Sequence, residues 1–452
     1  MKSKFKLERD LNEWGRLTMH PLTANRLGII NKDKWSVVFG IRAFLVEVHI
    51  SPKLSEERLL LSIDVIQFLS IPLFCSYEIV LEGKELVLGP FIGIVAEHWE
   101  DGMKRRLKPD ITGDLSLTQF TQDYQEVGGA IVAFSEEGVD PKEKMIMGYM
   151  FNPETKCWVK GEYSYPAALF AKVRVNRELA DHLHSKLGKE RIFNTPVFDK
   201  WAMHQLLASS RKLRTYLPAT ILYEQPGDIE MALDVYGPIY IKPVTGENGI
   251  GVQKVTKQGG RIFVHYRKHD RNREVRMRTS AEVHAYFGSI LQPGRFILQK
   301  ALELFSVENR IIDYRFIVVK SQDGQWIDMG LYARHGQLDS VISNMNAGAT
   351  PLAGEVALRE FFRMTENETY EFRKRLSLIG MNIAHKLDEH TVQCGNLGID
   401  IGVDRFKQIW IIEVNQVDPG HAIVEQVGYK QIHRQIRLAN MLFAKRLSGF
   451  KG

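Results

Sequence analysis

The sequence has little cysteine and no long hydrophobic run, and each shortage excludes a class of protein. Its three cysteines, Cys75, Cys157 and Cys394, lie far apart and outside any CxxC spacing. This argues against a disulfide framework or a structural zinc site and favours a reducing compartment. No apolar run reaches the roughly 18 residues that a membrane-spanning helix needs, and residues 1–16 lack the apolar core of a signal peptide. We therefore expect a cytoplasmic protein with no membrane partner.

A strong charge of one sign is also missing. The formal net charge of +6 is mild for 452 residues, so it suits anionic substrates such as nucleotides without indicating a nucleic-acid binder. Hydrophobic residues at 44% and charged residues at 25% are typical of a globular protein, and no low-complexity tract indicates disorder. The length predicts two or three domains of roughly 100–200 residues each.

The first 85 residues predict a small β-rich domain. Short apolar runs at 36–40, 44–50 and 59–63 alternate with polar turns, and Val46, Val48 and Ile50 alternate with polar residues at the period of a strand.

Residues 86–192 predict a small doubly wound α/β domain. The run 86–95 is continuously apolar, as in a strand buried on both faces of a parallel sheet. A helical stretch around 115–128 and a second apolar run at 129–134 complete a βαβ pattern. No GxGxxG motif follows the first strand, so nothing marks this domain as a dinucleotide site.

Residues 193–452 predict a mixed sheet with flanking helices, which makes the whole chain α/β (α+β) in fold class. Asp199 is placed to cap a helix that carries Leu206 and Leu207, and a second helix is expected over residues 368–389. The expected strands are 296–299, 314–319, 326–331, 398–403 and 409–415.

A glycine-rich hairpin over residues 239–255 is the first candidate binding site. Gly246, Gly249 and Gly251 would let its tip fold closely over a ligand and offer backbone N–H groups to a phosphate. Lys242 could place its ammonium against the same phosphates. The alternative is an ordinary glycine-rich hairpin with a surface lysine, because short glycine patterns also arise by chance.

A set of oxygen donors on two apolar strands is the second candidate. Glu413 and Asn415 are two residues apart, so their side chains leave the same face of one strand. If that strand forms a hairpin with 398–403 about residues 406–407, Asp400 falls opposite Glu413. Two carboxylates and an amide carbonyl suit Mg²⁺ bridging the phosphates of a nucleotide. Buried polar residues satisfied by neighbouring turns are the alternative.

Basic residues crowd the stretch 261–278, where two aromatic residues are interleaved with them. Nucleic-acid binding requires basic charge and stacking platforms, and this stretch has both. It also alternates like an exposed strand and turn. We favour the solvated face, so a nucleic-acid partner is not expected.

Taken in order, these motifs resemble the ATP-grasp fold. The resemblance rests on Lys242 with its glycine hairpin, the strand that runs into a linker at 296–303, and the motifs at 399–401 and 411–415. It runs from about residue 194 to the C-terminus. It implies an ATP-grasp domain over 193–452, preceded by a small doubly wound pre-ATP-grasp domain over 86–192 and the β-rich N-terminal domain over 1–85.

Four shorter motifs resemble a narrower group, the YheC/YheD endospore-coat-associated family of spore-forming bacteria. They are residues 198–201, 217–220, 313–315 and 415–420. That family also carries a small N-terminal extension.

The resemblance implies roles for individual residues. Lys200 and Lys242 would contact the α- and β-phosphates of ATP, with the backbone of residues 246–251 closing over them. Asp400, Glu413 and Asn415 would hold Mg²⁺. The hinge that hydrogen-bonds the adenine edge, with a carboxylate reaching the ribose, would comprise Gln299, Lys300, Ala301, Leu302 and Glu303.

Two arginines complete the implied site. Arg315 would face the γ-phosphate or an acyl-phosphate intermediate, where its planar fork suits bidentate contact. Arg334 and the loop 344–349 would lie near the acceptor. Either arginine could instead be a surface ion-pair partner, and Lys200 is also the first residue of a helix.

The implied activity is an ATP- and Mg²⁺-dependent ligation of a carboxylate to an amine or a thiol through an acyl phosphate. The expected substrates are small-molecule or peptide carboxylates and amines, and spore-coat proteins are possible partners at the developing coat. The alternative is a nucleotide-binding structural protein of the endospore coat with little or no turnover. Neither the substrates nor the oligomeric state follow from the sequence.

Overall fold

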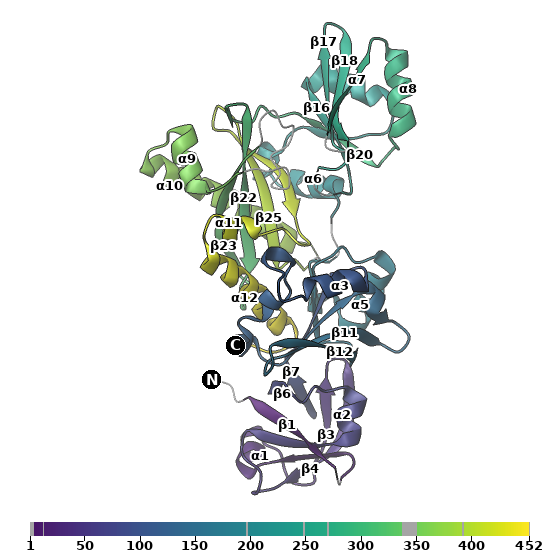
Figure 1. Cartoon of the computed structure of the whole chain (residues 1–452), viewed down its shortest axis with the longest axis vertical. Helices are drawn as coiled ribbons and strands as arrows, with labels where there is room; N and C mark the ends of the chain where they lie inside the picture. Colours follow the sequence, from purple (N-terminus) through teal and green to yellow (C-terminus); the bar gives the residue numbers. More distant parts are fainter. Residues whose placement is uncertain are drawn as a thin grey trace.

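Four β-sheets follow one another along an elongated molecule (Figure 1). This computed structural model describes residues 4–11, 13–195, 198–246, 249–268, 271–336, 350–390 and 393–451. None of the helices in these ranges combines the length and the apolar character needed to cross a membrane.

The first sheet is a closed barrel, which confirms that the N-terminal region is rich in β-structure. Its inner positions alternate with solvent-facing ones, as in β3, where Trp35, Val37 and Phe39 are buried. Helices α1 (Pro21–Leu27) and α2 (Ile63–Leu69) pack beside it. The strands are β1 (Phe5–Asp10), β2 (Arg16–Met19), β3 (Lys34–Phe39), β4 (Arg42–Ile50), β5 (Arg58–Ser62), β6 (Ser76–Glu82) and β7 (Glu85–Gly89).

The prediction of one continuous strand over 86–95 is wrong. The run divides into β7, which closes the barrel against β3 and β6, and β8 (Phe91–Glu97), which belongs to the second sheet. Pro90 lies between them and has no backbone N–H with which to continue a ladder, so the chain changes sheets there.

The second sheet is parallel at its centre, where β8 pairs with β9 (Ala130–Ser135) and β13 (Ala168–Ala171), and β13 with β14 (Ile192–Phe193). An antiparallel extension adds β10 (Val139–Asp140), β11 (Met145–Asn152) and β12 (Cys157–Ser164). Helices α3 (Glu100–Arg106) and α5 (Arg177–Leu187) pack against this sheet.

The helix expected over 115–128 is largely replaced by turns. Short 3₁₀ turns at Gly113–Leu115 and Thr118–Thr121 precede α4 (Tyr124–Val127). Tertiary hydrogen bonds engage the polar residues there: Asp114 accepts from the backbone of Ala422, and Thr118 accepts from the Trp158 indole. These contacts override the local helical pattern.

The remaining strands form two antiparallel sheets, so the prediction of one mixed sheet is wrong. The third sheet contains β15 (Thr220–Leu222), β16 (Ile239–Pro243), β17 (Gln253–Gln258), β18 (Arg261–Lys268), β19 (Arg271–Met277) and β20 (Phe296–Lys300). The fourth contains β21 (Ser306–Val307), β22 (Arg310–Lys320), β23 (Trp326–His335), β24 (Thr350–Ala353), β25 (Asn396–Val403) and β26 (Ile409–Asn415). Helices α7 (Gly227–Tyr236) and α8 (Ser280–Ile290) cover one face of the third sheet.

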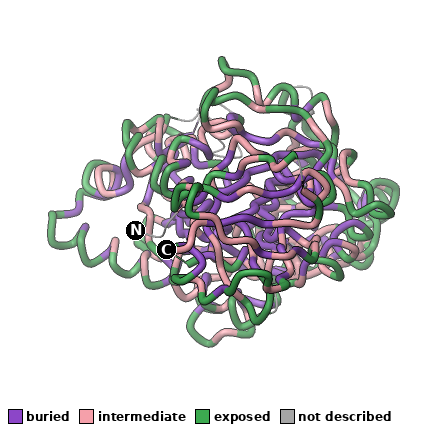
Figure 2. The backbone as a smooth tube through the Cα atoms, turned by 90° about the horizontal axis from the view of Figure 1, so that it is seen from below, coloured by how far each residue is buried: buried purple, intermediate pink, exposed green. Residues whose placement is uncertain are grey.

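Helices cover the fourth sheet on both faces, and every residue of its strand β25 is buried. Seen along its long axis, the molecule has most of its buried stretches in the interior and its exposed ones at the periphery (Figure 2). On one face lie α6 (Lys200–Ala208), α9 (Gly354–Phe362) and α10 (Glu366–Asp388). On the other, α11 (Ala422–Gln426) and α12 (Lys430–Leu447) cover Ile317 and Val319 of β22. Asp313 and Arg315 leave the same face of β22, and both line a cavity.

Candidate active site

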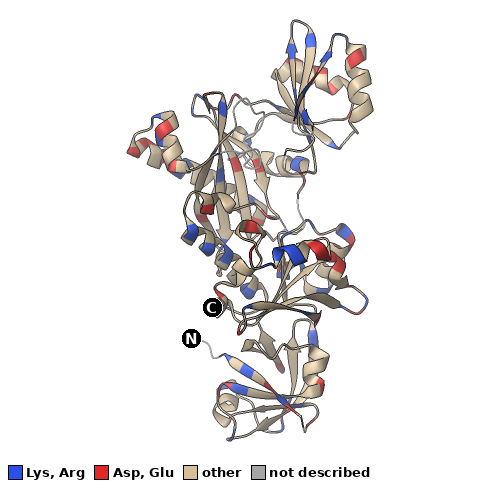
Figure 3. Ribbon diagram, viewed as in Figure 1, with Lys and Arg blue, Asp and Glu red and all other residues tan. Residues whose placement is uncertain are grey.

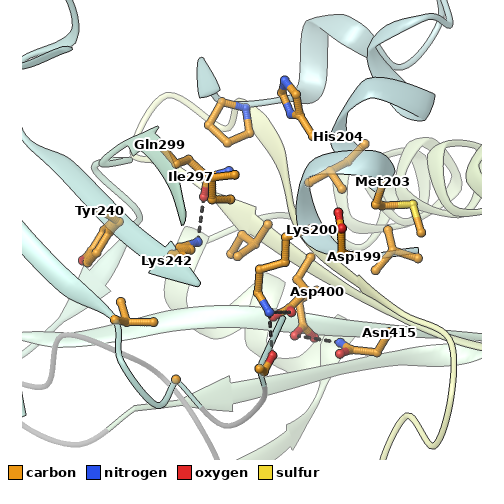
Figure 4. Close-up of a pocket in the computed structure, with 18 of the residues that line it drawn as sticks. Asp199, Lys200, Met203, His204, Tyr240, Lys242, Ile297, Gln299, Asp400 and Asn415 are labelled. Carbon is orange, nitrogen blue, oxygen red and sulfur yellow. Dashed lines mark hydrogen bonds and ion pairs between the residues drawn. The ribbon is translucent and has the colours of Figure 1, made fainter. Parts of the chain in front are cut away.

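A cavity of about 390 Å³ lies between the third and fourth sheets. Its lining comes from α6, β16 and β20 on one side and from β22, β23, β25 and β26 on the other. Arg174, which follows the last long strand of the second sheet, also lines it. Figure 4 shows the polar side chains of both sheets pointing toward one another across this space.

Lys242 lies at the end of β16 and is held by β20. Its Nζ donates to Oε1 of Gln299 at 2.6 Å, and Nε2 of Gln299 donates to the Thr220 hydroxyl at 3.1 Å. Burial lowers the pKa of Lys242 to about 8; Glu413 and Asp400 act in the opposite direction, and Lys200 adds to the lowering. Among the described residues, the Lys242 ammonium at the cavity wall therefore bonds a neutral amide and no carboxylate.

The glycine hairpin that follows Lys242 is formed as predicted, with β16 antiparallel to β17. Gly249 and Gly251 have φ of 72° and 77°, in the left-handed region that favours glycine. Gly246 and Gly249 line the cavity, and the carbonyl of Gly246 accepts from Lys200 at 2.6 Å. Residues 247–248 lie outside the described residues.

Lys200 begins α6, whose N-terminus is capped by Asp199 accepting from the amide of Ala202. Besides its bond to Gly246, the Nζ of Lys200 lies 3.0 Å from Oε1 of Glu413. Lys200 therefore connects the glycine hairpin to the fourth sheet.

Strand register places the charged side chains of the fourth sheet in alternating rows. Arg315 of β22 is paired with Asp400 of β25, and Asp400 with Glu413 of β26, which confirms the predicted pairing of the two carboxylates. In the neighbouring row, Arg334 of β23 is paired with Asp313 of β22. Each arginine thus faces a carboxylate on the adjacent strand, where cross-strand neighbours interact most strongly, while the carboxylates of Asp400 and Glu413 face one another.

Ion pairs hold these rows together. Arg334 contacts both oxygens of Asp313, at 2.8 and 2.7 Å, and also lies 3.0 Å from Oδ1 of Asp400. Nε of Arg315 lies 2.7 Å from the same Asp400 oxygen. Burial would lower the pKa of Arg334, but Asp313 and Asp400 outweigh it and raise that pKa, so the guanidinium stays charged. Asp400 is therefore shared by two arginines, of which Arg334 is buried and Arg315 is 11% exposed.

Asn415 completes the oxygen donors, with its Nδ2 3.4 Å from Oδ2 of Asp400. The described residues contain no group of three or more His, Cys, Asp or Glu side chains that could hold a metal ion, so a cation here depends on the amide oxygen of Asn415. Two facing carboxylates and an amide form an all-oxygen set, which fits Mg²⁺ better than a transition metal.

The loop that follows Asn415 is fixed by the second sheet and its neighbours. Lys172, whose side chain is 3% exposed, lies 2.5 Å from Asp418, and the side-chain amide of Asn194 donates to the carbonyl of Val417 at 3.1 Å. Asp114 accepts from the amide of Ala422 at 2.6 Å. The second sheet's domain therefore positions one wall of the cavity.

Most of the residues predicted from the sequence line the cavity, namely Lys200, Lys242, Gly246, Gly249, Gln299, Lys300, Leu302, Arg315, Arg334, Asp400, Glu413 and Asn415. Gly251, Ala301 and Glu303 do not belong to the lining. Glu303 is exposed and lies 3.9 Å from Arg405. The predicted acceptor loop 344–349 lies outside the described residues.

The predicted hinge after β20 is partly engaged by the fold itself. The amide of Lys300 donates to Ala219 and that of Ala301 donates to Pro238, each at 2.8 Å. The side chain of Gln299 holds Lys242. Of this segment, Gln299, Lys300 and Leu302 line the cavity.

Sequence reasoning missed Asp313 as the partner of Arg334 and Asp418 as the partner of Lys172. The available signal for Asp313 was its spacing of two from Arg315, which puts both side chains on one face of a strand. Asp418 belongs to the motif 415–420, but nothing in that motif indicates its pairing with Lys172, which is 246 residues away in the sequence.

The sequence model of the "YheC/D like ATP-grasp" family matches residues 189–447, more than half of the chain. "Endospore coat-associated protein YheD" of Bacillus subtilis (strain 168) is 23% identical over 406 residues, which cover 87% of this chain and 86% of that protein. "Endospore coat-associated protein YheC" of the same organism is 21% identical over 316 residues, covering 68% of this chain and 85% of that protein.

Among solved structures, D-alanyl-alanine synthetase A from Vibrio cholerae O1 biovar eltor str. N16961 matches 78% of this chain and 98% of its own. The sequence identity is 11% and the TM-score is 0.42. N5-carboxyaminoimidazole synthetase from Staphylococcus aureus matches 75% of this chain and 77% of its own, with 13% identity and a TM-score of 0.40.

Proposed function

The chain belongs to the YheC/D like ATP-grasp family, and we propose that it is a Mg²⁺- and ATP-dependent ligase that joins a carboxylate to an amine or a thiol. The observation that carries this proposal is the convergence, on one cavity between two sheets, of cationic side chains with three oxygen donors. These are Lys200, Lys242, Arg315 and Arg334 with Asp400, Glu413 and Asn415.

The proposed reaction has two steps. A carboxylate oxygen of the substrate attacks the γ-phosphorus of ATP, and ADP leaves. The amine or thiol then attacks the carbonyl carbon of the acyl phosphate, inorganic phosphate leaves, and the nucleophile loses its proton. Phosphoryl transfer of this kind depends on positioning and on charge stabilisation rather than on a protein nucleophile.

The residues of the cavity suit those needs. Lys242 and Lys200 would bind the α- and β-phosphates beneath the glycine hairpin. Arg315 and Arg334 would face the γ-phosphate and the acyl group, where charge develops on the transferred oxygens. Lys300 and Leu302 would contact the adenine end. The roles proposed for Gly251, Ala301 and Glu303 would require backbone movement or closure, because these residues lie outside the lining.

Asp400, Glu413 and Asn415 are the residues that would hold Mg²⁺. When bound, the ion would neutralise phosphate oxygens and polarise the γ-phosphoryl group. Arg315, Arg334 and Lys200 already neutralise these two carboxylates, so they would have to share them with the ion.

The substrates would be small-molecule or peptide carboxylates and amines, in keeping with a cavity of this size. The curated relatives are endospore coat-associated by name, so we also propose that this chain acts in the cytoplasm near the forming spore coat and contacts coat proteins.

The metal and nucleotide assignment is tested with the double variant Glu413→Gln and Asn415→Ala. We expect loss of Mg²⁺-dependent ATP binding, measured by isothermal titration with and without the metal, while far-UV circular dichroism stays unchanged. The loss should reach at least about tenfold, because charge-assisted contacts to phosphate typically contribute more than 1.4 kcal/mol each. Unchanged affinity in the folded variant would refute the assignment.

A second candidate is a nucleotide-binding structural protein of the spore coat that turns over little or no ATP. One observation favours it: both metal-site carboxylates are already paired with cations of the chain. The release of ADP on incubation with candidate amino acids and peptides separates the two. Tight Mg-ATP binding without acceptor-dependent ADP release would favour the structural role.

A further inference from the structure

The outer hairpin of the third sheet concentrates positive charge that the proposed active site does not use. Residues 253–278 contain nine Lys or Arg residues and two acidic residues, whereas the whole chain has a net charge of only +6. This one segment therefore outweighs the net charge of all the rest. Basic residues recur along the strands of this lobe, which lies at one end of the molecule (Figure 3).

Strand β19 lies at the edge of the third sheet. The sheet order ends with it, and among the described residues no strand pairs with its outer side. Nearly all of its residues are exposed, up to the buried Met277. About half of the backbone N–H and C=O groups of such a strand point away from its neighbour, so they are available to another extended chain.

The arginines of this edge are on both faces. Val275 packs against the core under α7 and α8, so Arg271 and Arg273 share the helix side of the sheet, while Arg276 and Arg278 leave the opposite side. Arg276 is bound to Glu274. Arg271, Arg273 and Arg278 are exposed and form no ion pair with any carboxylate in the described parts of the chain.

The aromatic rings near this edge are already occupied. The Arg276 guanidinium lies 5.9 Å from the centre of the Phe263 ring in the neighbouring strand β18. Tyr266 packs against the hydrophobic core. Binding of a single-stranded nucleic acid needs open rings for bases to stack on, and these are not open. A polyanion that lies on one face of the sheet would also miss at least one of these three arginines.

We propose that β19 is a docking edge for an extended acidic polypeptide, which adds to the third sheet as a further strand. Backbone hydrogen bonds would supply the pairing, and Asp or Glu side chains on both faces of the added strand would meet Arg271, Arg273 and Arg278. The choice of a polypeptide over other polyanions rests on the proposed function. An acidic polypeptide carries carboxylates, and carboxylates are the groups that the proposed ligase would join to an amine or a thiol.

Binding is tested with the full-length protein and a fluorescein-labelled oligoglutamate of about ten residues, long enough to lie along the seven residues of β19. Fluorescence anisotropy is followed without ATP, so the result does not depend on ligase activity. The triple variant Arg271→Glu, Arg273→Glu and Arg278→Glu should weaken binding at least about tenfold, and added salt should weaken wild-type binding.

The matched control is Lys53→Glu with Lys142→Glu and Lys189→Glu, which changes the net charge equally at exposed lysines elsewhere. Its affinity should stay within about twofold of the wild type, since exposed charges farther apart than the Debye length are screened. Equal losses in both variants would show unspecific attraction and overturn the proposal. Tighter binding of a labelled oligothymidylate, lost in the triple variant, would overturn it in favour of nucleic acid.

Two further results separate this docking edge from the proposed ligase. ATP-dependent turnover of a small substrate should survive in the triple variant, because none of its three arginines lines the cavity. Loss of oligoglutamate binding with retained turnover supports the docking edge. Wild-type protein that hydrolyses ATP with small acceptors but does not bind oligoglutamate would refute the docking edge alone.

Discussion

At Lys242 two effects oppose one another. Burial disfavours the ammonium, while the carboxylates of Glu413 and Asp400 favour it, and the pKa of Lys242 falls to about 8. In the described part of the chain, the hydrogen-bond acceptor of Lys242 is the neutral amide of Gln299 rather than a carboxylate. An incoming phosphate would supply the missing negative charge and raise the pKa, so nucleotide binding should take up a proton in this pH range.

This gives a pH dependence with a definite sign. Lys242 is mostly protonated at pH 7 and mostly neutral above its pKa of about 8, so ATP affinity should fall as the pH rises from 7 to 9.5. Loss of one charged contact corresponds to about tenfold in the dissociation constant. Isothermal titration with ATP at several pH values between 7 and 9.5 measures this change in the dissociation constant.

Two variants serve as controls for Lys242. Lys242→Arg keeps its charge throughout this range, so its affinity should stay flat with pH. Lys242→Met should bind weakly at every pH and lose the dependence. A wild-type affinity that does not change between pH 7 and 9.5 would contradict the assignment of Lys242 to the phosphates.

Some of the site could be predicted residue by residue and some could not. The pairing of Asp400 with Glu413 followed from the sequence, because the short turn between their strands fixes the register. The contact of Arg334 with Asp313 did not follow, because a register shift between Ile317 and Val318 sets how β22 meets β23. Such an irregularity leaves no period in the sequence.

On the scale of single elements, β25 carries a glycine where the site requires space. A Cβ on Gly398 would lie 2.3 Å from Nη1 of Arg315 and 2.6 Å from Cβ of Pro419. Arg315 cannot simply move away, because it is largely enclosed and bound to Asp400. The absence of a side chain at Gly398 therefore lets the Arg315 side chain lie close against strand β25.

Gly398→Ala should consequently both destabilise the protein and weaken the site. Overpacking of this kind typically costs about 1–3 kcal/mol of unfolding free energy. Urea denaturation should show that loss, and ATP affinity should fall with it because Arg315 is displaced. Gly227→Ala is the matched control, since a Cβ there meets nothing within 4 Å. Equal stability of the two variants would contradict the packing argument.

The same scale shows what periodicity does and does not reveal. The long helix α10 begins and ends within about two residues of its predicted range, because its apolar spacing spans many turns and a capping box fixes its start. The division of the last strands into two sheets was missed, because sheet membership depends on long-range pairing. The prediction of one strand over 86–95 was wrong for a related reason, because this single apolar stretch supplies one strand to each of two sheets.

On the scale of the whole molecule, the C-terminal helix α12 connects separate parts of the chain. Ile436 and Ala439 pack against the fourth sheet, and Phe443 packs in the core of the second. Near the end of α12, Lys445 forms an ion pair with Glu78 of the barrel strand β6. Both side chains are nearly inaccessible to solvent, at 4% and 5% exposed.

Removal of one partner of this pair should be costly. Lys445→Met leaves the carboxylate of Glu78 buried without its ion-pair partner, and such losses typically reach roughly 3–5 kcal/mol of unfolding free energy. Adding Glu78→Leu should restore most of that loss, because a hydrophobic pair replaces the buried ions. Urea denaturation followed by far-UV circular dichroism measures both variants.

The exposed ion pair between Lys6 and Glu154 provides the comparison, because it also connects the barrel to the second sheet's domain. Lys6→Met should cost less than about 1 kcal/mol, since solvent screens the pair. Neither Lys445 nor Lys6 lines the cavity, so ATP affinity in the absence of urea should be unchanged in both. If Lys445→Met were no more destabilising than Lys6→Met, the buried pair could not be what secures the barrel to α12. If it weakened ATP binding in the folded protein, α12 would transmit the disturbance from the barrel to the site.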